Sequence, residues 1–137
     1  MTPPGARCGL FGYPQVVSFA ADDLALFDRS EEVDIETRAP GGDPHRAIIW
    51  VVVDAADVFI RSVRGERGRW YREAVANPAV ALLVDGRGLT GTAIPASDPE
   101  SVERVSAALR RKYVADPALR TMLLEHTLPT TLRLEPA

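Results

Sequence analysis

Residue types that often carry function are scarce in this sequence. Cys8 is the only cysteine, so the chain can form no internal disulfide and no cysteine-based zinc site. The two histidines, His45 and His126, lie far apart and belong to no ligand motif, which argues against a metal site. Lys112 is the only lysine, so arginine carries almost all of the positive charge. Neither disulfide nor metal chemistry is therefore expected.

Long apolar runs are also absent from the amino-terminal segment, where Gly9, Gly12 and Pro14 interrupt the pattern. This argues against a signal peptide or a membrane span there and favours a cytoplasmic protein. The formal net charge is −3 at pH 7, which argues against nucleic acid as the main partner because nucleic-acid-binding domains are usually strongly basic. We expect residues 1–17, rich in proline and glycine, to form an arm, and residues 18–137 to form one domain.

Apolar residues in the rest of the chain recur at the spacing of strands and helices. Alternating or β-branched runs predict six strands, at residues 33–38, 47–53, 58–63, 80–84, 89–95 and 130–135. Capping and periodic patterns predict helices at residues 18–29, at 67–76, from 98 onward and from 116 onward. Because tight turns link the strands and the helices are segregated, we predict a mainly β fold with α, an antiparallel barrel with flanking helices.

The most distinctive stretch is DVFIRSVRGERGRWYREAVANP, residues 57–78. Twelve consecutive residues of this stretch contain five arginines but only one acid, Glu66. Several of them lie at the start of a predicted helix, where the helix dipole disfavours cations, so the cluster is costly unless an anion neutralises it. Free N–H groups at a helix start and forked guanidinium groups together suit a phosphate. The alternative, of equal weight on charge alone, is a solvated basic turn paired with acids elsewhere.

Three blocks carry a family resemblance: HRAIIWVVV, VFIRSVRGERGRWYREAVANP and AVALLVDGRGLTGTAIPASDPE. They resemble the flavin-binding split-barrel clan, which contains pyridoxamine-phosphate-oxidase-like and deazaflavin-dependent nitroreductase-like proteins. The closing LPTTLRLEP is similar to a compact, largely uncharacterised family of that clan, and the resemblance covers residues 31–136. It implies a six-stranded antiparallel split β-barrel that pairs into a homodimer. It also implies flavin mononucleotide (FMN) or a deazaflavin coenzyme in a groove at the dimer interface, and a small-molecule redox substrate.

The resemblance further implies a cofactor-binding set. Basic residues on the second strand and in the turn before the short helix would hold the phosphate, and strand residues would line the ring and its ribityl chain. The implied set is Arg46, Ile48, Trp50, Arg61, Ser62, Arg67, Gly68, Arg69, Trp70 and Tyr71. The turn lacks the Arg-Lys pair of the true pyridoxamine phosphate oxidases, and residues 132–137 hold no clear match to their substrate-binding Arg and His. Pyridoxamine phosphate is therefore not the expected substrate.

Three functions remain open at this point. The first is a flavin- or deazaflavin-dependent oxidoreductase. The second is a non-catalytic cofactor- or haem-binding or sensing protein of the same fold, and the third is an Arg-rich interaction domain. No catalytic side chain is identified: Tyr71 and Tyr113 could donate a proton, but a tyrosine on an apolar helix face is more often a core residue. Trp50 and Trp70 are likewise more often packing residues, although a tryptophan can cover a flavin.

Overall fold

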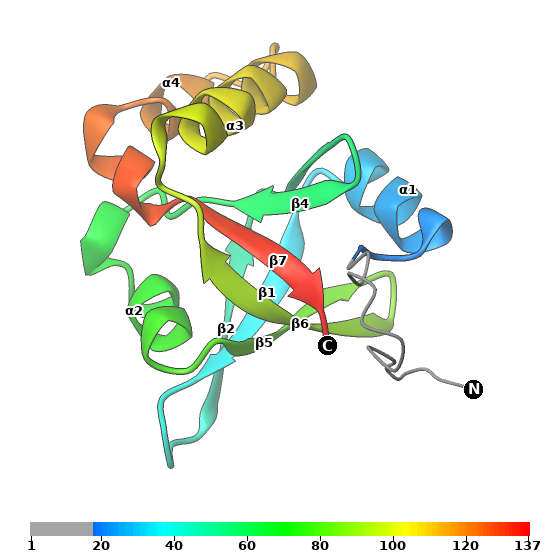
Figure 1. The fold of residues 1–137 in the computed structure, drawn as a ribbon, viewed down its shortest axis with the longest axis vertical. Helices are drawn as coiled ribbons and strands as arrows, with labels where there is room; N and C mark the ends of the chain where they lie inside the picture. Colours follow the sequence, from blue (N-terminus) through cyan, green and yellow to red (C-terminus); the bar gives the residue numbers. More distant parts are fainter. Residues whose placement is uncertain (1–17) are drawn as a thin grey trace, which may run out of the picture.

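The computed structural model describes residues 18–137 (Figure 1). In chain order the elements, with η for a 3-10 helix, are α1 (Ala21–Arg29), β1 (Val33–Arg38), β2 (Pro44–Ile49), β3 (Val52–Asp54), β4 (Asp57–Ile60), η2 (Gly65–Arg67), α2 (Arg69–Ala76), β5 (Ala79–Val84), β6 (Arg87–Pro95), α3 (Pro99–Lys112), α4 (Leu119–Met122), η3 (Glu125–Thr130) and β7 (Leu132–Pro136). The expected arm at residues 1–17, with Cys8, lies outside the described residues.

One seven-stranded sheet, antiparallel throughout, forms the body of the protein. Its strand order is β2-β1-β5-β6-β7-β4-β3. The two edge strands, β2 and β3, follow one another in the chain, and only Trp50 and Val51 separate them. Because so short a connection spans only about 10 Å, the two edges must lie close together. The sheet therefore curls into an incompletely closed barrel (Figure 1).

The predicted antiparallel, mainly β fold is confirmed, but the predicted number of six strands is wrong. The β-branched run 47–53 predicts one strand, whereas the structure divides it into β2 and β3. β2 pairs with β1, while β3 turns away and pairs with β4. This division leaves the barrel split. The barrel is split here because the first part of this run pairs with β1 and the last part pairs with β4.

Two apolar clusters hold the barrel and its helices together. Inside the barrel, residues of α1, β1 and the central strands pack around Phe27 and Ile35, both fully buried. Outside it, α3 and α4 cover β3 and β4 through a cluster that includes Phe59, Val105 and Tyr113. Figure 1 shows these two helices together on one side of the sheet and α2 on another. The helices therefore flank the barrel, as predicted, and they lie on separate faces of it.

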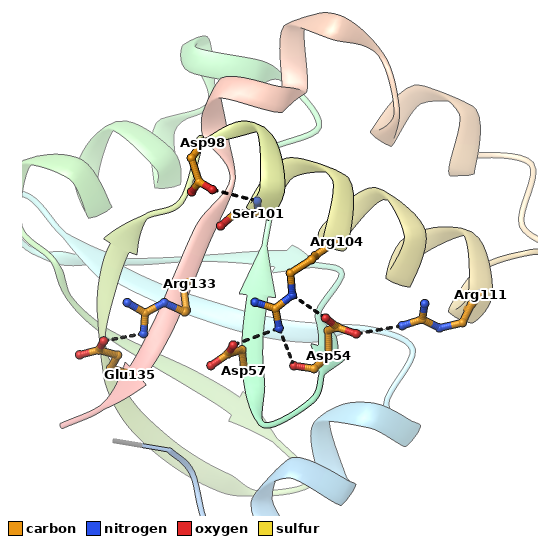
Figure 2. Close-up of polar contacts among 8 residues, drawn as sticks. All are labelled: Asp54, Asp57, Asp98, Ser101, Arg104, Arg111, Arg133 and Glu135. Atoms are coloured by element: carbon orange, nitrogen blue, oxygen red, sulfur yellow. Dashed lines mark hydrogen bonds and ion pairs between the residues drawn. The ribbon is translucent and has the colours of Figure 1, made fainter. Parts of the chain in front are cut away.

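Helix α3 is fixed at both ends. As the sequence predicts, it begins with an Asp98 cap, whose carboxylate accepts a hydrogen bond from the N–H of Ser101 at 3.0 Å. Along its length, Arg104 Nε donates to Asp54 Oδ2 at 2.7 Å and its Nη2 donates to Asp57 Oδ2 at 3.1 Å (Figure 2). Arg111 pairs with Asp54 as well, at 3.3 Å. These pairs clamp α3 onto the tight β3–β4 hairpin.

The carboxyl end of α3 reaches the point where the barrel is split. Lys112 Nζ donates to the carbonyl oxygens of Phe27 and Val51, at 2.9 and 2.6 Å. The Tyr113 hydroxyl donates to the carbonyl of Glu31 at 2.8 Å and accepts from the N–H of Val51 at 3.4 Å. Val51 is fully buried and belongs to neither neighbouring strand. α3 therefore supplies the polar partners that the interrupted sheet cannot give this residue.

No helix among residues 18–137 combines the length and the apolar character that a membrane crossing needs.

Lys112 generates a prediction about stability and pH. Desolvation by burial lowers the pKa of Lys112 to about 8, although Asp28 and Glu31 act in the opposite direction. In the unfolded chain the ordinary value of 10.5 applies, so between about pH 8 and 10.5 the unfolded state binds more protons than the folded state. The contribution of Lys112 to the free energy of unfolding therefore rises with pH in this interval. Urea unfolding of the wild type and of Lys112→Met at several pH values measures it.

The difference between these two proteins should shift in favour of the wild type as the pH rises above about 8. Lys112→Arg is the control, because a guanidinium keeps its charge and gives no such slope. The titration of Tyr113 cancels in the comparison, since every variant retains it. An unchanging difference across the interval would show that the amine is not desolvated.

Candidate functional site

Two adjoining cavities form a groove between β2, the turn at residues 61–68 and α2. The first has a volume of about 170 Å³ and extends from Trp50 toward Met122. The second has a volume of about 230 Å³ and extends toward Thr37. Both are lined by Ile48, Val63 and Trp70, so we treat them as the apolar end and the basic end of one groove.

Three arginines from three elements line the basic end: Arg46 from β2, Arg64 from the turn and Arg69 from α2. Arg46 Nε lies 3.1 Å from a carboxylate oxygen of Glu36. Arg69 Nε lies 4.0 Å from Glu73, at the limit of an ion pair. Arg64 has no ion pair within residues 18–137. Positive charge therefore exceeds negative charge at this end.

The start of α2 adds to this charge. Its first turn contains no acidic residue, and no side chain caps its first N–H groups. Gly68 is the cap residue and lines the basic end together with Arg69. The N–H groups of a first turn and the helix dipole favour an anion. The composition of this end thus fits a phosphate or carboxylate.

Aromatic and aliphatic side chains dominate the apolar end. The ring of Trp50 stacks on Tyr113, with centroids 3.9 Å apart and planes 6° apart. Trp70 meets Tyr71 edge to face at 6.4 Å. Ile48 is 68% exposed and Val63 is 45% exposed, which is unusual for apolar residues at the seam of a cavity. A planar apolar group would find a rigid indole and uncovered aliphatic surface here.

Arg61 is buried in the wall of the apolar end and bonded entirely within the protein. Its Nε donates to Thr131 Oγ1 at 3.0 Å, and Nη1 donates to Ser106 Oγ at 3.2 Å and to the carbonyl of Met122 at 3.1 Å. Nη2 donates to the carbonyl of Val102 at 3.1 Å. Desolvation and then the charge of Arg110 lower the pKa of Arg61 to about 10, so the group stays charged at neutral pH. It joins the end of β4 to α3, to α4 and to Thr131, the residue between η3 and β7, and it can act on a ligand through its charge.

Ser62 builds the turn that carries the arginines. Its hydroxyl donates to the carbonyl of Gly65 at 2.8 Å, and its backbone N–H donates to Thr130 Oγ1 at 2.9 Å. Gly65 has a φ of 67°, which only glycine adopts without strain. A Cβ atom on Gly68 would lie 2.5 Å from Ser62 Oγ. The spacing Ser62, Gly65, Gly68 therefore sets where α2 begins.

Eight of the ten residues in the expected cofactor set line the groove. The other two do not. Arg67 lines a separate cavity, together with His126 and Pro129. Tyr71 packs against the interior cluster of the barrel, and desolvation and then Glu66 raise its pKa. Arg64, which the expected set omits, lines both cavities.

Sequence reasoning missed a polar cluster at the basic end. Glu73 of α2 accepts a hydrogen bond from Thr37 Oγ1 of β1 at 2.9 Å and lies 3.0 Å from His45 Nδ1 of β2. Burial raises the pKa of Glu73, but the hydrogen bonds from Thr37 and His45 and the charges of His45 and Arg69 outweigh it, so that this pKa lies below its ordinary value. His45 is half-buried and lines the groove. No local signal marks these residues, which lie 28 and 36 positions from Glu73.

Within residues 18–137, no group of three or more His, Cys, Asp or Glu side chains is placed to hold a metal ion.

Solved structures resemble the whole domain. A conserved hypothetical protein from Mycobacterium tuberculosis matches with a TM-score of 0.65 at 16% identity, covering 88% of this chain and 81% of that one. HutZ, the haem storage protein from Vibrio cholerae, matches with 0.61 at 13% identity, covering 85% and 88%. An F420 reductase matches with 0.55 at 18% identity, covering 82% and 91%. Since a pyridoxamine-phosphate-oxidase-like protein is also among the neighbours, the split-barrel resemblance is confirmed.

A family model matches residues 23–134 and is described as "Uncharacterized protein conserved in bacteria (DUF2255)". No curated protein matches the sequence significantly.

The contact between Gly68 and Ser62 generates a prediction about the turn. Gly68→Ala places its Cβ on the Ser62 hydroxyl, and we expect a loss of about 1–3 kcal/mol in the free energy of unfolding, as for other overpacked sites. Ser62→Ala alone removes one buried hydrogen bond. In the double variant the missing hydroxyl leaves room for the new methyl group. The double variant should therefore lose less free energy of unfolding than the sum of the two single losses. Chemical denaturation of the four proteins measures this coupling, and additive losses would contradict the steric account.

Proposed function

The chain belongs to the family of uncharacterised bacterial proteins whose model spans residues 23–134, and from that premise we propose that its groove binds a phosphorylated redox coenzyme. The coenzyme is FMN or its deazaflavin counterpart, and the reaction is hydride transfer to a small molecule. One observation carries this proposal: the groove joins an apolar end lined by Trp50 to a basic end lined by Arg46, Arg64 and Arg69.

Both cofactors have the same division, a flat ring system at one end and a phosphate at the other. The arginines and the uncapped start of α2 would hold the phosphate. Trp50, Ile48 and Trp70 would cover the ring. A bound coenzyme supplies the hydride chemistry, while the chain binds and orients it and excludes water from it. The F420 reductase and the pyridoxamine-phosphate-oxidase-like protein among the structural neighbours support this assignment.

The groove of one chain is open along its apolar seam. Its two ends measure about 170 and 230 Å³, so together they lie near the lower bound of the range of about 300–1,000 Å³ that is usual for small-molecule sites. Ile48 and Val63 remain uncovered at its centre. A second copy of the chain that covers this apolar seam would complete the wall. We therefore include a homodimer in the proposal.

The first test of this function compares arginines on and off the groove. Arg69→Ala removes a guanidinium that lines the basic end, and charge-assisted hydrogen bonds contribute about 1.5–3 kcal/mol. We expect the affinity for FMN, and for the deazaflavin coenzyme, to fall by about 10- to 100-fold. Arg72→Ala is the matched control, because this exposed residue of the same helix does not line the groove. Fluorescence titration with each coenzyme measures the affinities.

Arg67→Ala separates the expectation from sequence from the arrangement in the structure. Sequence resemblance puts Arg67 at the phosphate, whereas in the structure it lines the separate cavity beside His126 and Pro129. We expect this variant to bind like Arg72→Ala. Equal affinities for Arg69→Ala, Arg72→Ala and the wild type would refute the groove as the phosphate site. Absence of any coenzyme binding by the wild type would refute the function itself.

The second test concerns the dimer. Ile48→Asp puts a charge on the exposed seam of the groove, where a second copy would have to desolvate it. We expect this variant to be monomeric and to bind FMN at least about 10-fold more weakly. Val114→Asp is the control, since Val114 is 76% exposed and lines neither end of the groove. Sedimentation equilibrium measures the mass, and a dimer that tolerates Ile48→Asp would place the interface elsewhere.

Haem binding without catalysis is the second candidate function. HutZ and a haem-binding protein from Mycobacterium smegmatis are structural neighbours. The basic end of the groove would accept carboxylates as readily as a phosphate, and His45 supplies a nitrogen base beside it. An absorption titration with ferric haem, run beside the coenzyme titrations, distinguishes the two functions. Tighter binding of haem than of either coenzyme, lost in Arg69→Ala, would favour this candidate.

A further inference from the structure

Arg61 is a buried cation without an acidic partner. It is 1% exposed, and the four hydrogen bonds that it donates go to neutral hydroxyl and carbonyl oxygens. No carboxylate within residues 18–137 forms an ion pair with it. A buried charge is costly and is usually paired with a charge of opposite sign. The wall of the groove therefore contains a positive charge that no buried carboxylate neutralises.

The other charges around Arg61 leave this imbalance in place. Burial and then the charge of Arg110, which is also a cation, lower the pKa of Arg61 to about 10. The guanidinium therefore remains charged at neutral pH. Glu32 lines the same cavity as Arg61, but this residue is exposed, so water and salt screen its carboxylate. The buried cation is screened less than the exposed anion that opposes it.

The cavity that Arg61 lines is the end of the groove that the proposed function gives to the coenzyme ring. Trp50 and Trp70, which would cover the ring, line this cavity together with Arg61. The arginines of the basic end line the other cavity, which Arg61 does not line and where the phosphate would lie. Because the interaction between two charges weakens with distance, Arg61 acts mainly on charge that develops at the ring.

Reduction changes the charge of the ring but not that of the phosphate. The ring system of oxidised FMN is neutral, and when it takes up two electrons and one proton from a reductant and its surroundings it becomes an anion. A cation beside the ring therefore stabilises the reduced form more than the oxidised form. A cation at the phosphate stabilises both forms to a similar extent.

We propose that Arg61 sets the redox balance of the coenzyme, because its buried guanidinium makes the groove bind the reduced ring more tightly than the oxidised ring. This inference rests on the proposed function. A purely structural role, in which Arg61 only joins the end of β4 to α3 and α4, would affect folding and the binding of both forms alike. A role through charge affects the ratio of the two affinities.

The test measures the dissociation constants of oxidised FMN and of dithionite-reduced FMN without oxygen, by quenching of tryptophan fluorescence. Both tryptophans of the chain, Trp50 and Trp70, line the groove and can report its occupancy. We expect the wild type to bind reduced FMN about 10-fold more tightly than oxidised FMN. For a two-electron couple this ratio corresponds to a reduction potential about 30 mV above that of free FMN.

Arg61→Gln removes the charge and retains a side chain that can form hydrogen bonds, so its two dissociation constants should be nearly equal. Arg61→Lys keeps the charge and should keep most of the preference for reduced FMN. Glu32→Gln should increase this preference, since it removes the opposing charge at the ring end. A wild type that binds both forms equally, or an Arg61→Gln variant with the wild-type ratio, would overturn the proposal.

Arg69→Ala is the matched control at the phosphate. Arg69 lines the basic end, so its loss should weaken the binding of oxidised and reduced FMN by a similar factor and leave their ratio unchanged. If Arg69→Ala changes the ratio as much as Arg61→Gln does, the preference for the reduced form does not come from a charge at the ring, and the proposal fails.

Nuclear magnetic resonance of the wild type decides the case in which Arg61→Gln does not fold. The Nε–H of Arg61 is buried and donates to Thr131 Oγ1 at 3.0 Å, so it exchanges slowly with water, and through-bond experiments assign it. Reduction of bound FMN should shift this signal. The Nε–H of Arg104, which donates to Asp54 and lines neither end of the groove, should not shift. An unchanged Arg61 signal would contradict the proposal.

The outcomes separate this proposal from the function on which it rests. If the wild type binds FMN but Arg61→Gln leaves the ratio of affinities unchanged, the role of Arg61 is wrong and the function stands. If the wild type binds neither FMN nor the deazaflavin coenzyme, both are wrong. If it binds the deazaflavin coenzyme alone, the same titrations use the oxidised and reduced forms of that coenzyme, whose ring undergoes the same change of charge.

Discussion

Everything in this fold depends on how one buried residue between two strands keeps its backbone hydrogen-bonded. Val51 lies where the chain leaves one edge of the sheet and enters the other, so no strand can satisfy its N–H and C=O. Lys112 and Tyr113 at the end of α3 supply both partners. Because the Tyr113 ring also stacks on Trp50, the same helix end fixes the indole that lines the groove. The residues that hold the barrel together at this point therefore also position the indole of the candidate site.

Much of the fold could be predicted from the sequence because it follows from local patterns. The Asp98 cap marks the start of α3, and the alternation in residues 33–38 marks β1. The division of the run 47–53 could not be predicted, since a continuous β-branched run is equally compatible with one strand or two. The choice is made by pairing with β1 and β4, which are remote in sequence.

The candidate site, like the fold, could be predicted from the sequence only in part. Its arginine cluster is visible as composition, but which arginines share the groove depends on where α2 begins. A continuous helix from residue 67 would carry Arg67 and Arg69 on the same helix end, whereas the extended Gly68 between η2 and α2 places them on different cavities. The Thr37–His45–Glu73 cluster gives no signal at all in the sequence. It forms only because α2 packs across the paired strands β1 and β2.

Arg61 shows how the wall of the groove favours one sign of ligand charge. The cation is 1% exposed, and all of its recorded partners, Thr131, Ser106, Met122 and Val102, are neutral hydroxyl or carbonyl oxygens. These dipoles solvate the charge but do not neutralise it, and a charge in a poorly polarisable interior acts over a longer range than one in water. Arg61 therefore favours electron-rich or anionic groups in the cavity that it lines, but Glu32 lines the same cavity and opposes this preference. The preference for an anion is accordingly strongest at the basic end, where Arg46, Arg64 and Arg69 line the groove.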